Sequence, residues 1–129
     1  MARILVVDDD DTIRDTLHEL LSEDYECDTA ETAEIAVGKL DNGKYELVLT
    51  DISMPGLSGV DLLKLIREKY SDTPVILISG IGDQERAESL IKLGAFDFIT
   101  KPFSLETVEQ GVRRAVESAE RQKRGEAES

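Results

Sequence analysis

Five short apolar runs, rich in β-branched residues, alternate along the chain with segments in which apolar residues recur at helical spacing. The strands that this pattern predicts are Ile4–Asp8, Glu26–Ala30, Leu47–Asp51, Val75–Ser79 and Phe96–Thr100. Each is followed within a few residues by a helical segment, and right-handed crossovers of this kind join strands that run in the same direction. The sequence therefore predicts an α/β fold: a doubly wound, five-stranded parallel sheet with helices on both faces.

The length of 129 residues fits one domain. We expect residues 1–121 to form this domain and residues 122–129 to form a charged C-terminal tail or the start of a linker. Apolar residues recur at helical spacing from Leu105 to Ala119, but the residues that follow are mostly polar and include Gly125. The last helix is therefore expected to fray after Ala119.

The composition limits the kinds of partner that the chain can have. A formal net charge of -13 would repel a phosphate backbone, so direct binding of DNA or RNA is not expected. No apolar run approaches the roughly 20 residues of a membrane span, so we expect a cytoplasmic protein outside the membrane. The single Cys27 has no second cysteine with which to form an internal disulfide, and it lacks the Cys and His residues that a metal site needs. We expect its side chain to pack against other residues of the fold.

Chemically active side chains stand where the predicted strands end. Asp8–Asp10 follow the first strand, Asp51 closes the third, Ser79 closes the fourth and Lys101 follows the fifth. In doubly wound sheets ligands bind beyond the carboxyl ends of the strands, so these groups are expected to converge. Two like charges ~4 Å apart repel by roughly 4 kcal/mol at an effective dielectric of about 20, and a cation would offset this repulsion. Carboxylate oxygens suit Mg²⁺, which commonly uses one or two of them together with phosphate oxygens.

Asp51 is the best placed nucleophile in this group. It stands alone at the end of a buried strand, and the Pro and Gly residues after it form a turn that lets a ligand approach the backbone. An aspartate can carry a phosphoryl group as an acyl phosphate, with Lys101 and the Ser79 hydroxyl stabilising the phosphoryl oxygens. Simpler interpretations remain open here: an acidic helix cap for the first cluster and an ordinary turn aspartate for Asp51.

The segments ILVVDDD, VLTDISMPGLSG, VILISG and DFITKPF occur in this order across nearly the whole chain. They resemble the four signatures of the receiver domain of two-component response regulators, the chemotaxis response regulators among them. The resemblance implies the flavodoxin-like strand order 2-1-3-4-5, which receiver domains share with flavodoxin.

The same resemblance implies a role for each matching residue at the acidic end. Asp51 would be the phosphoacceptor. Asp8, Asp9 and Asp51 would hold Mg²⁺ together with the backbone carbonyl of Ser53. Ser53 and Ile81 would also occupy positions at which relatives vary their rate of dephosphorylation.

A second group of residues would detect the phosphoryl group. Ser79 would be the switch hydroxyl, Lys101 would pair with the phosphoryl group, and Phe98 would be the aromatic switch, without a hydroxyl to donate. The bond between Lys101 and Pro102 would be cis. Asp10 matches a position that is acidic in many relatives, and Asp11 would cap or begin the first helix.

The partners implied are a sensor histidine kinase or a phosphotransfer protein, and an output domain or target protein. The chain would be a switch rather than an enzyme, with a surface of the fourth helix, fifth strand and fifth helix that changes on phosphorylation. The same surface could support a homodimer.

Two other classes of protein fit parts of the sequence. Asp8-x-Asp10-x-Thr12 matches the DxDxT signature of haloacid-dehalogenase-type, Mg²⁺-dependent phosphatases, with Asp8 as nucleophile. That class needs a further acidic motif after its lysine, whereas here Gly82-Asp83 precedes Lys101. A flavin or nucleotide module needs a phosphate cradle after the first strand, where this chain has carboxylates.

Overall fold

The computed structural model describes residues 1–54, 56–80 and 84–128. Its sheet has five parallel strands in the order β2-β1-β3-β4-β5. The strands are β1 (Arg3–Val7), β2 (Glu26–Ala30), β3 (Leu47–Asp51), β4 (Val75–Ser79) and β5 (Asp97–Thr100). The predicted fold class and strand order are confirmed, and the strand bounds differ from the expected ones by one residue only at β1 and at the start of β5.

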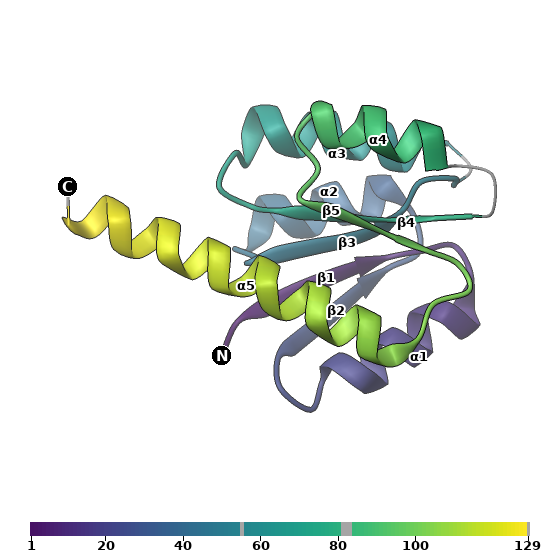
Figure 1. The fold of residues 1–129 in the computed structure, drawn as a ribbon, viewed down its shortest axis with the longest axis horizontal. Helices are drawn as coiled ribbons and strands as arrows, with labels where there is room; N and C mark the ends of the chain where they lie inside the picture. The colour runs from purple at the N-terminus through teal and green to yellow at the C-terminus, as the bar shows by residue number, and fades with distance from the viewer. Residues whose placement is uncertain (55, 81–83, 129) are drawn as a thin grey trace.

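Helices cover both faces of the sheet (Figure 1). They are α1 (Asp11–Leu21), α2 (Ala33–Asn42), α3 (Gly59–Lys69), α4 (Gln84–Lys92) and α5 (Leu105–Glu128). Helices α1 and α5 lie on one face, and α2, α3 and α4 lie on the other. Because all five strands run in the same direction, the connection after each strand lies at the same edge of the sheet.

Alternation along the strands divides the apolar residues into two cores. In β1, Ile4 and Val6 pack toward α1 and α5, whereas Leu5 and Val7 pack toward α2 and α3. Every residue of β3 and β4 is buried, because helices cover both faces of these central strands. Cys27 of β2 packs against the α1–α5 core as expected, and burial raises the pKa of its thiol to about 12.

Helix α5 differs from the expectation. It continues to Glu128 and extends beyond the sheet (Figure 1), so the prediction that it frays after Ala119 was wrong. Its backbone hydrogen bonds do not require an apolar face, and Glu, Arg, Gln and Lys are good helix formers. Over the described ranges, no helix combines the length and apolarity that crossing a bilayer requires.

The start of α1 fixes the loop that follows β1. The Asp10 side chain caps this helix by accepting hydrogen bonds from the backbone N–H groups of Thr12 and Ile13. Asp11 therefore begins the helix, the second of the two roles expected for it. The cap holds the chain immediately after Asp8 and Asp9 in one conformation.

A close backbone approach holds the end of β3 against the start of α3. A Cβ atom at Gly59 would lie 2.1 Å from the backbone oxygen of Asp51 and 2.9 Å from the Cα of Ile52. The Gly59 N–H donates a hydrogen bond to the Ile52 carbonyl oxygen at 3.0 Å. Only glycine permits this contact, which sets the position of the Asp51 main chain.

We therefore expect Gly59→Ala to lower the free energy of unfolding by about 1–3 kcal/mol, the usual effect of overpacking. Gly38→Ala is the matched control, because a Cβ at Gly38, inside α2, meets nothing within 4 Å. The control should raise stability by about 0.5–1 kcal/mol, since alanine favours a helix interior. Urea unfolding followed by circular dichroism measures both, and equal stability of the two variants would contradict the close approach.

Candidate functional site

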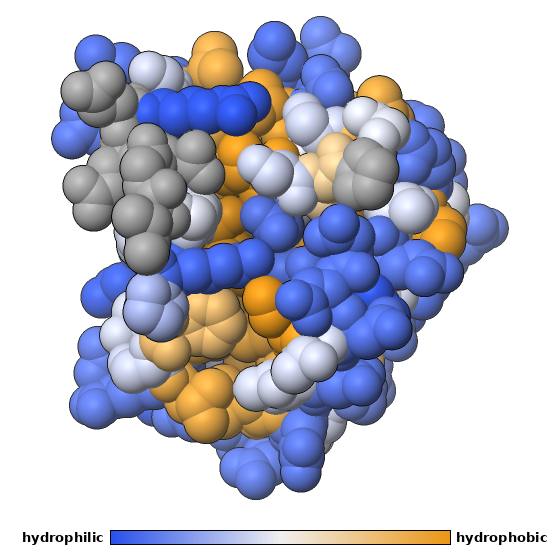
Figure 2. Space-filling model, turned by 90° about the vertical axis from the view of Figure 1, so that its right-hand side faces the viewer, coloured by the Kyte–Doolittle hydropathy of each residue, from blue (hydrophilic) through white to orange (hydrophobic). Residues whose placement is uncertain are grey.

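The carboxyl ends of the strands bring together the side chains that the sequence singled out. Asp8 follows β1, Asp51 ends β3, Ser79 ends β4 and Lys101 follows β5. Figure 2 views the molecule from this side, where hydrophilic side chains surround recessed hydrophobic areas. Residues far apart in the sequence meet here because parallel strands end at the same edge.

Three carboxylates form the centre of the site. One oxygen from each of Asp8, Asp9 and Asp51 lies within 4.8 Å of the other two. Asp8 is fully buried and Asp51 is 7% exposed, whereas Asp9 is exposed to solvent. The cluster therefore combines two carboxylates inside the protein with one at its surface.

Backbone amides orient the two buried carboxylates in the same way. The Asp10 N–H donates to Oδ1 of Asp8 at 2.9 Å, and the Ser53 N–H donates to Oδ1 of Asp51 at 3.2 Å. Each aspartate thus accepts a hydrogen bond from the residue two positions later, a local arrangement that its short side chain favours. In both residues the Oδ2 atom remains for contacts with groups from other parts of the chain.

Lys101 reaches both buried carboxylates from the end of β5. Its Nζ lies 3.1 Å from Oδ2 of Asp51 and 3.8 Å from Oδ2 of Asp8. The Lys101 backbone N–H donates to the carbonyl oxygen of Ser79 at 2.7 Å, and the peptide bond to Pro102 is cis, as expected. One ammonium beside three carboxylates leaves the cluster with an excess of negative charge.

The donor set fits a divalent cation such as Mg²⁺. Within residues 1–54, 56–80 and 84–128, no group donates a hydrogen bond to the buried Oδ2 of Asp8. The pKa of Asp8 is raised to about 6, mainly by burial and also by the charge of Asp51, while the hydrogen bond from the Asp10 N–H and the charge of Lys101 act in the opposite direction. Hard carboxylate oxygens with excess negative charge are the ligands that Mg²⁺ prefers. The expected role of the Ser53 carbonyl stays a prediction.

Ser79 presents a second buried polar atom without a partner. Its Oγ is fully buried and makes no hydrogen bond with any of the residues that the structure describes. A buried hydroxyl without a partner destabilises the fold by about 1–3 kcal/mol, so such a group calls for an explanation. A ligand oxygen near Asp51 and Lys101 would supply the missing partner.

Phe98 lies on β5, three residues before Lys101, and outside the carboxylate cluster. It is half-buried and packs against the core on the α2–α3–α4 face. Any effect of Phe98 on the site must therefore act through packing. Its role as an aromatic switch stays a prediction, and Ile81, Gly82 and Asp83 lie outside the described residues.

Sequence reasoning missed Arg14. Its Nη1 donates to the backbone oxygen of Asp8 at 2.9 Å, and its Nη2 pairs with Asp11. The side chain thus ties α1 to the acidic loop. The pairing with Asp11, three residues away on the helix, is visible in the sequence, but the contact with a main-chain oxygen has no sequence signal.

Comparison with known proteins agrees with this geometry. The family described as the response regulator receiver domain matches residues 4–113. The response regulator FleR of Pseudomonas aeruginosa is 38% identical over 103 residues, which are 79% of this chain and 22% of that protein. The transcriptional regulator FixJ of Bradyrhizobium diazoefficiens is 34% identical over 125 residues, 96% of this chain and 61% of that protein. The chain thus spans less than two thirds of either relative.

A solved structure shows the same fold. The receiver domain of NtrX from Brucella abortus superimposes with a TM-score of 0.85 at 41% sequence identity. The match covers 88% of this chain and 98% of that one. The likeness therefore covers most of this chain and nearly all of that receiver domain.

The buried charge of Asp8 leads to a stability prediction. In the absence of divalent metal at pH 8, Asp8→Asn is expected to raise the free energy of unfolding by about 1–3 kcal/mol, because it removes a desolvated charge while keeping the shape. Urea unfolding in EDTA measures this difference. Asp15→Asn is the matched control, because Asp15 is exposed on α1 and should change stability by less than about 0.5 kcal/mol.

The difference in stability between Asp8→Asn and the wild type should depend on pH. The pKa of Asp8 is raised from an ordinary 3.8 to about 6, so the folded state holds its proton more tightly than the unfolded state. The contribution of Asp8 to stability therefore falls as pH rises from about 4 to about 6, and the full penalty is present above that window. The advantage of Asp8→Asn should be largest at pH 8 and small at about pH 4. An equal advantage at both values would contradict a raised pKa.

Proposed function

Because this chain belongs to the response regulator receiver domain family of two-component systems, we propose that Asp51 accepts a phosphoryl group from a sensor histidine kinase or a phosphotransfer protein. The observation that supports this most directly is the position of the Asp51 carboxylate, 3.1 Å from the Lys101 ammonium and inside the acidic cluster. A nucleophile, a cation for the phosphoryl oxygens and candidate metal ligands thus share one edge of the sheet.

The chemistry is a nucleophilic displacement at phosphorus. An Asp51 oxygen forms the new bond to phosphorus, the bond from phosphorus to the donor's imidazole nitrogen breaks, and its electron pair leaves with the imidazole. Lys101 neutralises part of the charge on the phosphoryl oxygens, and the Ser79 hydroxyl donates to one of them. The Ser53 N–H keeps the Asp51 carboxylate in position at 3.2 Å. Phosphoryl transfer depends mainly on such positioning and charge stabilisation.

The metal in this proposal is Mg²⁺, held by Asp8, Asp9 and Asp51 with the backbone carbonyl of Ser53. Bound there, it would supply positive charge to the phosphoryl oxygens. This assignment is supported by the excess negative charge of the cluster and by Oδ2 of Asp8, which receives no hydrogen bond from the described residues. Among these ligands, Asp9 is the one that a hydrated ion can reach from solvent, because its carboxylate is exposed.

Phosphorylation would act as a switch. The unpaired Ser79 hydroxyl and the half-buried Phe98 stand on the adjacent strands β4 and β5, so a phosphoryl group that attracts Ser79 can bias the packing of Phe98. The α4–β5–α5 surface would carry the change to an output domain or target protein, or to a second copy of the chain. Exposed Leu93 and Phe96, 50% and 37% accessible, offer apolar contacts between α4 and β5.

In this proposal the chain is a switch that catalyses only its own phosphorylation and dephosphorylation, rather than an enzyme with a separate substrate. Exchange with a histidine kinase or phosphotransfer protein would take place in the cytoplasm.

The phosphatase alternative is not favoured. It would use Asp8 as nucleophile and Asp10 as general acid, yet the Asp10 carboxylate is occupied in capping α1. Asp8 is fully buried and has its Oδ1 bound by the Asp10 N–H. The relatives and the solved structure are response regulators, which agrees with Asp51 as the reacting group.

Phosphorylation of the intact chain tests the proposal. Incubation with acetyl phosphate and Mg²⁺ should add one labile phosphoryl group, measured by intact mass, and removal of Mg²⁺ by EDTA should suppress it. Asp51→Ala should abolish the adduct because it removes the nucleophile. Persistence of the adduct in Asp51→Ala, with its loss in Asp8→Ala, would instead identify Asp8 as the nucleophile.

Metal binding offers an independent test. Asp9→Asn should weaken Mg²⁺ binding by about tenfold or more, because it removes one charged ligand from the cluster. Its exposure means that the fold should remain intact. Isothermal titration calorimetry measures the affinity, with Asp15→Asn as a control of equal charge change outside the cluster. Equal affinities for the two variants would exclude Asp9 from the metal site.

A further inference from the structure

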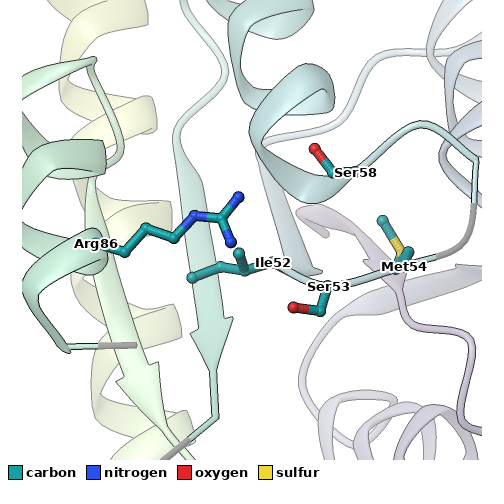
Figure 3. Close-up of a pocket in the computed structure, with 5 residues that line it drawn as sticks. All are labelled: Ile52, Ser53, Met54, Ser58 and Arg86. Carbon is teal, nitrogen blue, oxygen red and sulfur yellow. The ribbon is translucent and has the colours of Figure 1, made fainter. Parts of the chain in front are cut away.

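A cavity opens between the β3–α3 connection and α4 (Figure 3). Its volume is about 430 Å³, and its walls are Ile52, Ser53, Met54, Ser58 and Arg86. Four of these residues belong to the connection between β3 and α3, and Arg86 comes from α4. The cavity thus lies between two elements that are far apart in the sequence.

Two of the residues that line the cavity directly follow Asp51 in the chain. Ile52 and Ser53 follow Asp51 directly, and the Ser53 N–H donates to the Asp51 carboxylate at 3.2 Å. A small molecule that transfers a group to Asp51 can therefore extend its remaining part into this space. Met54, which is partly exposed, gives the space an apolar wall, and the fully buried Ile52 lies behind it.

Arg86 gives the cavity a positive charge. Its side chain extends from α4 toward Ile52, with the guanidinium directed into the space (Figure 3). Among the described residues at this edge, Arg14 and Lys101 are engaged with aspartates, whereas no ion pair is formed by Arg86. In a chain of formal net charge -13, this cation is available to an anion that approaches the acidic cluster.

We propose that the cavity is a subsite for the leaving group of acyl phosphates, and that Arg86 binds the carboxylate that departs. This inference rests on the proposed phosphorylation of Asp51. An Asp51 oxygen forms a bond to phosphorus, the bond from phosphorus to the acyl oxygen breaks, and the electron pair leaves on the carboxylate. The planar guanidinium matches a carboxylate with two parallel hydrogen bonds, and the acyl carbons contact Met54.

Arg86 would then determine which small donors react well. Phosphoramidate transfers its phosphoryl group by breaking a phosphorus–nitrogen bond, and the protonated nitrogen leaves as neutral ammonia. A guanidinium does not stabilise this leaving group, because ammonia carries no negative charge. The ratio of the rates with acetyl phosphate and phosphoramidate therefore isolates the effect of Arg86 on the leaving group from any general effect on the acceptor.

The experiment measures the phosphorylation rate of the full chain with each donor by intact mass, in Mg²⁺. Arg86→Ala should lower the rate with acetyl phosphate by about threefold, the effect expected of one exposed ionic contact, and leave the rate with phosphoramidate unchanged. Arg86→Lys keeps the charge and should retain part of the preference. Raising the salt concentration should reduce the difference between wild type and Arg86→Ala.

Lys92→Ala is the matched control, since Lys92 is an exposed cation in the last turn of the same helix and outside the cavity. It should leave the ratio of the two rates unchanged. Equal loss of rate with both donors, no loss with either, or the same change in Lys92→Ala would overturn the assignment of Arg86. Each of these results leaves the proposed function intact if Asp51→Ala still abolishes the adduct, whereas phosphorylation of Asp51→Ala would refute the proposed function itself.

Discussion

The structure depends most on the electrostatic balance among Asp8, Asp9, Asp51 and Lys101. Two of the three carboxylates are buried, and one ammonium lies 3.1 Å and 3.8 Å from them. Burial away from water strengthens both the repulsion within the cluster and its attraction for cations. The same excess charge that penalises the fold thus suits the cation and the phosphoryl chemistry proposed for this site.

The scaffold holds this unfavourable group by means of short, rigid connections. The cap at Asp10, the amide contact from Ser53 and the close approach of Gly59 fix the main chain on either side of the acidic residues. The buried apolar strands beneath supply the stability that the site removes. Such a distribution is typical of functional sites, which are seldom optimised for stability.

Polar groups without partners mark the places where the structure is prepared for a ligand. Oδ2 of Asp8 and Oγ of Ser79 are buried and receive no hydrogen bond from the residues that the structure describes, and both residues end or follow strands at the edge that carries the proposed site. Arg86 differs from them because its side chain is exposed. It is available to an anionic ligand because its guanidinium points into a cavity. Of the three groups, Ser79 ends β4, and Arg86 lies on α4, which belongs to the surface proposed to respond.

The sequence by itself determined the sheet, its strand bounds to within a residue and the gathering of Asp8, Asp51, Ser79 and Lys101, because periodicity locates strands and parallel strands end at one edge. It did not determine the length of α5, since a helix can continue on backbone propensity after its apolar pattern stops. Only the tertiary structure decided that Lys101 reaches two carboxylates, that the Ser79 hydroxyl lacks a partner and that Arg86 enters a cavity. These features depend on side-chain directions across elements distant in the chain, which local sequence patterns do not encode.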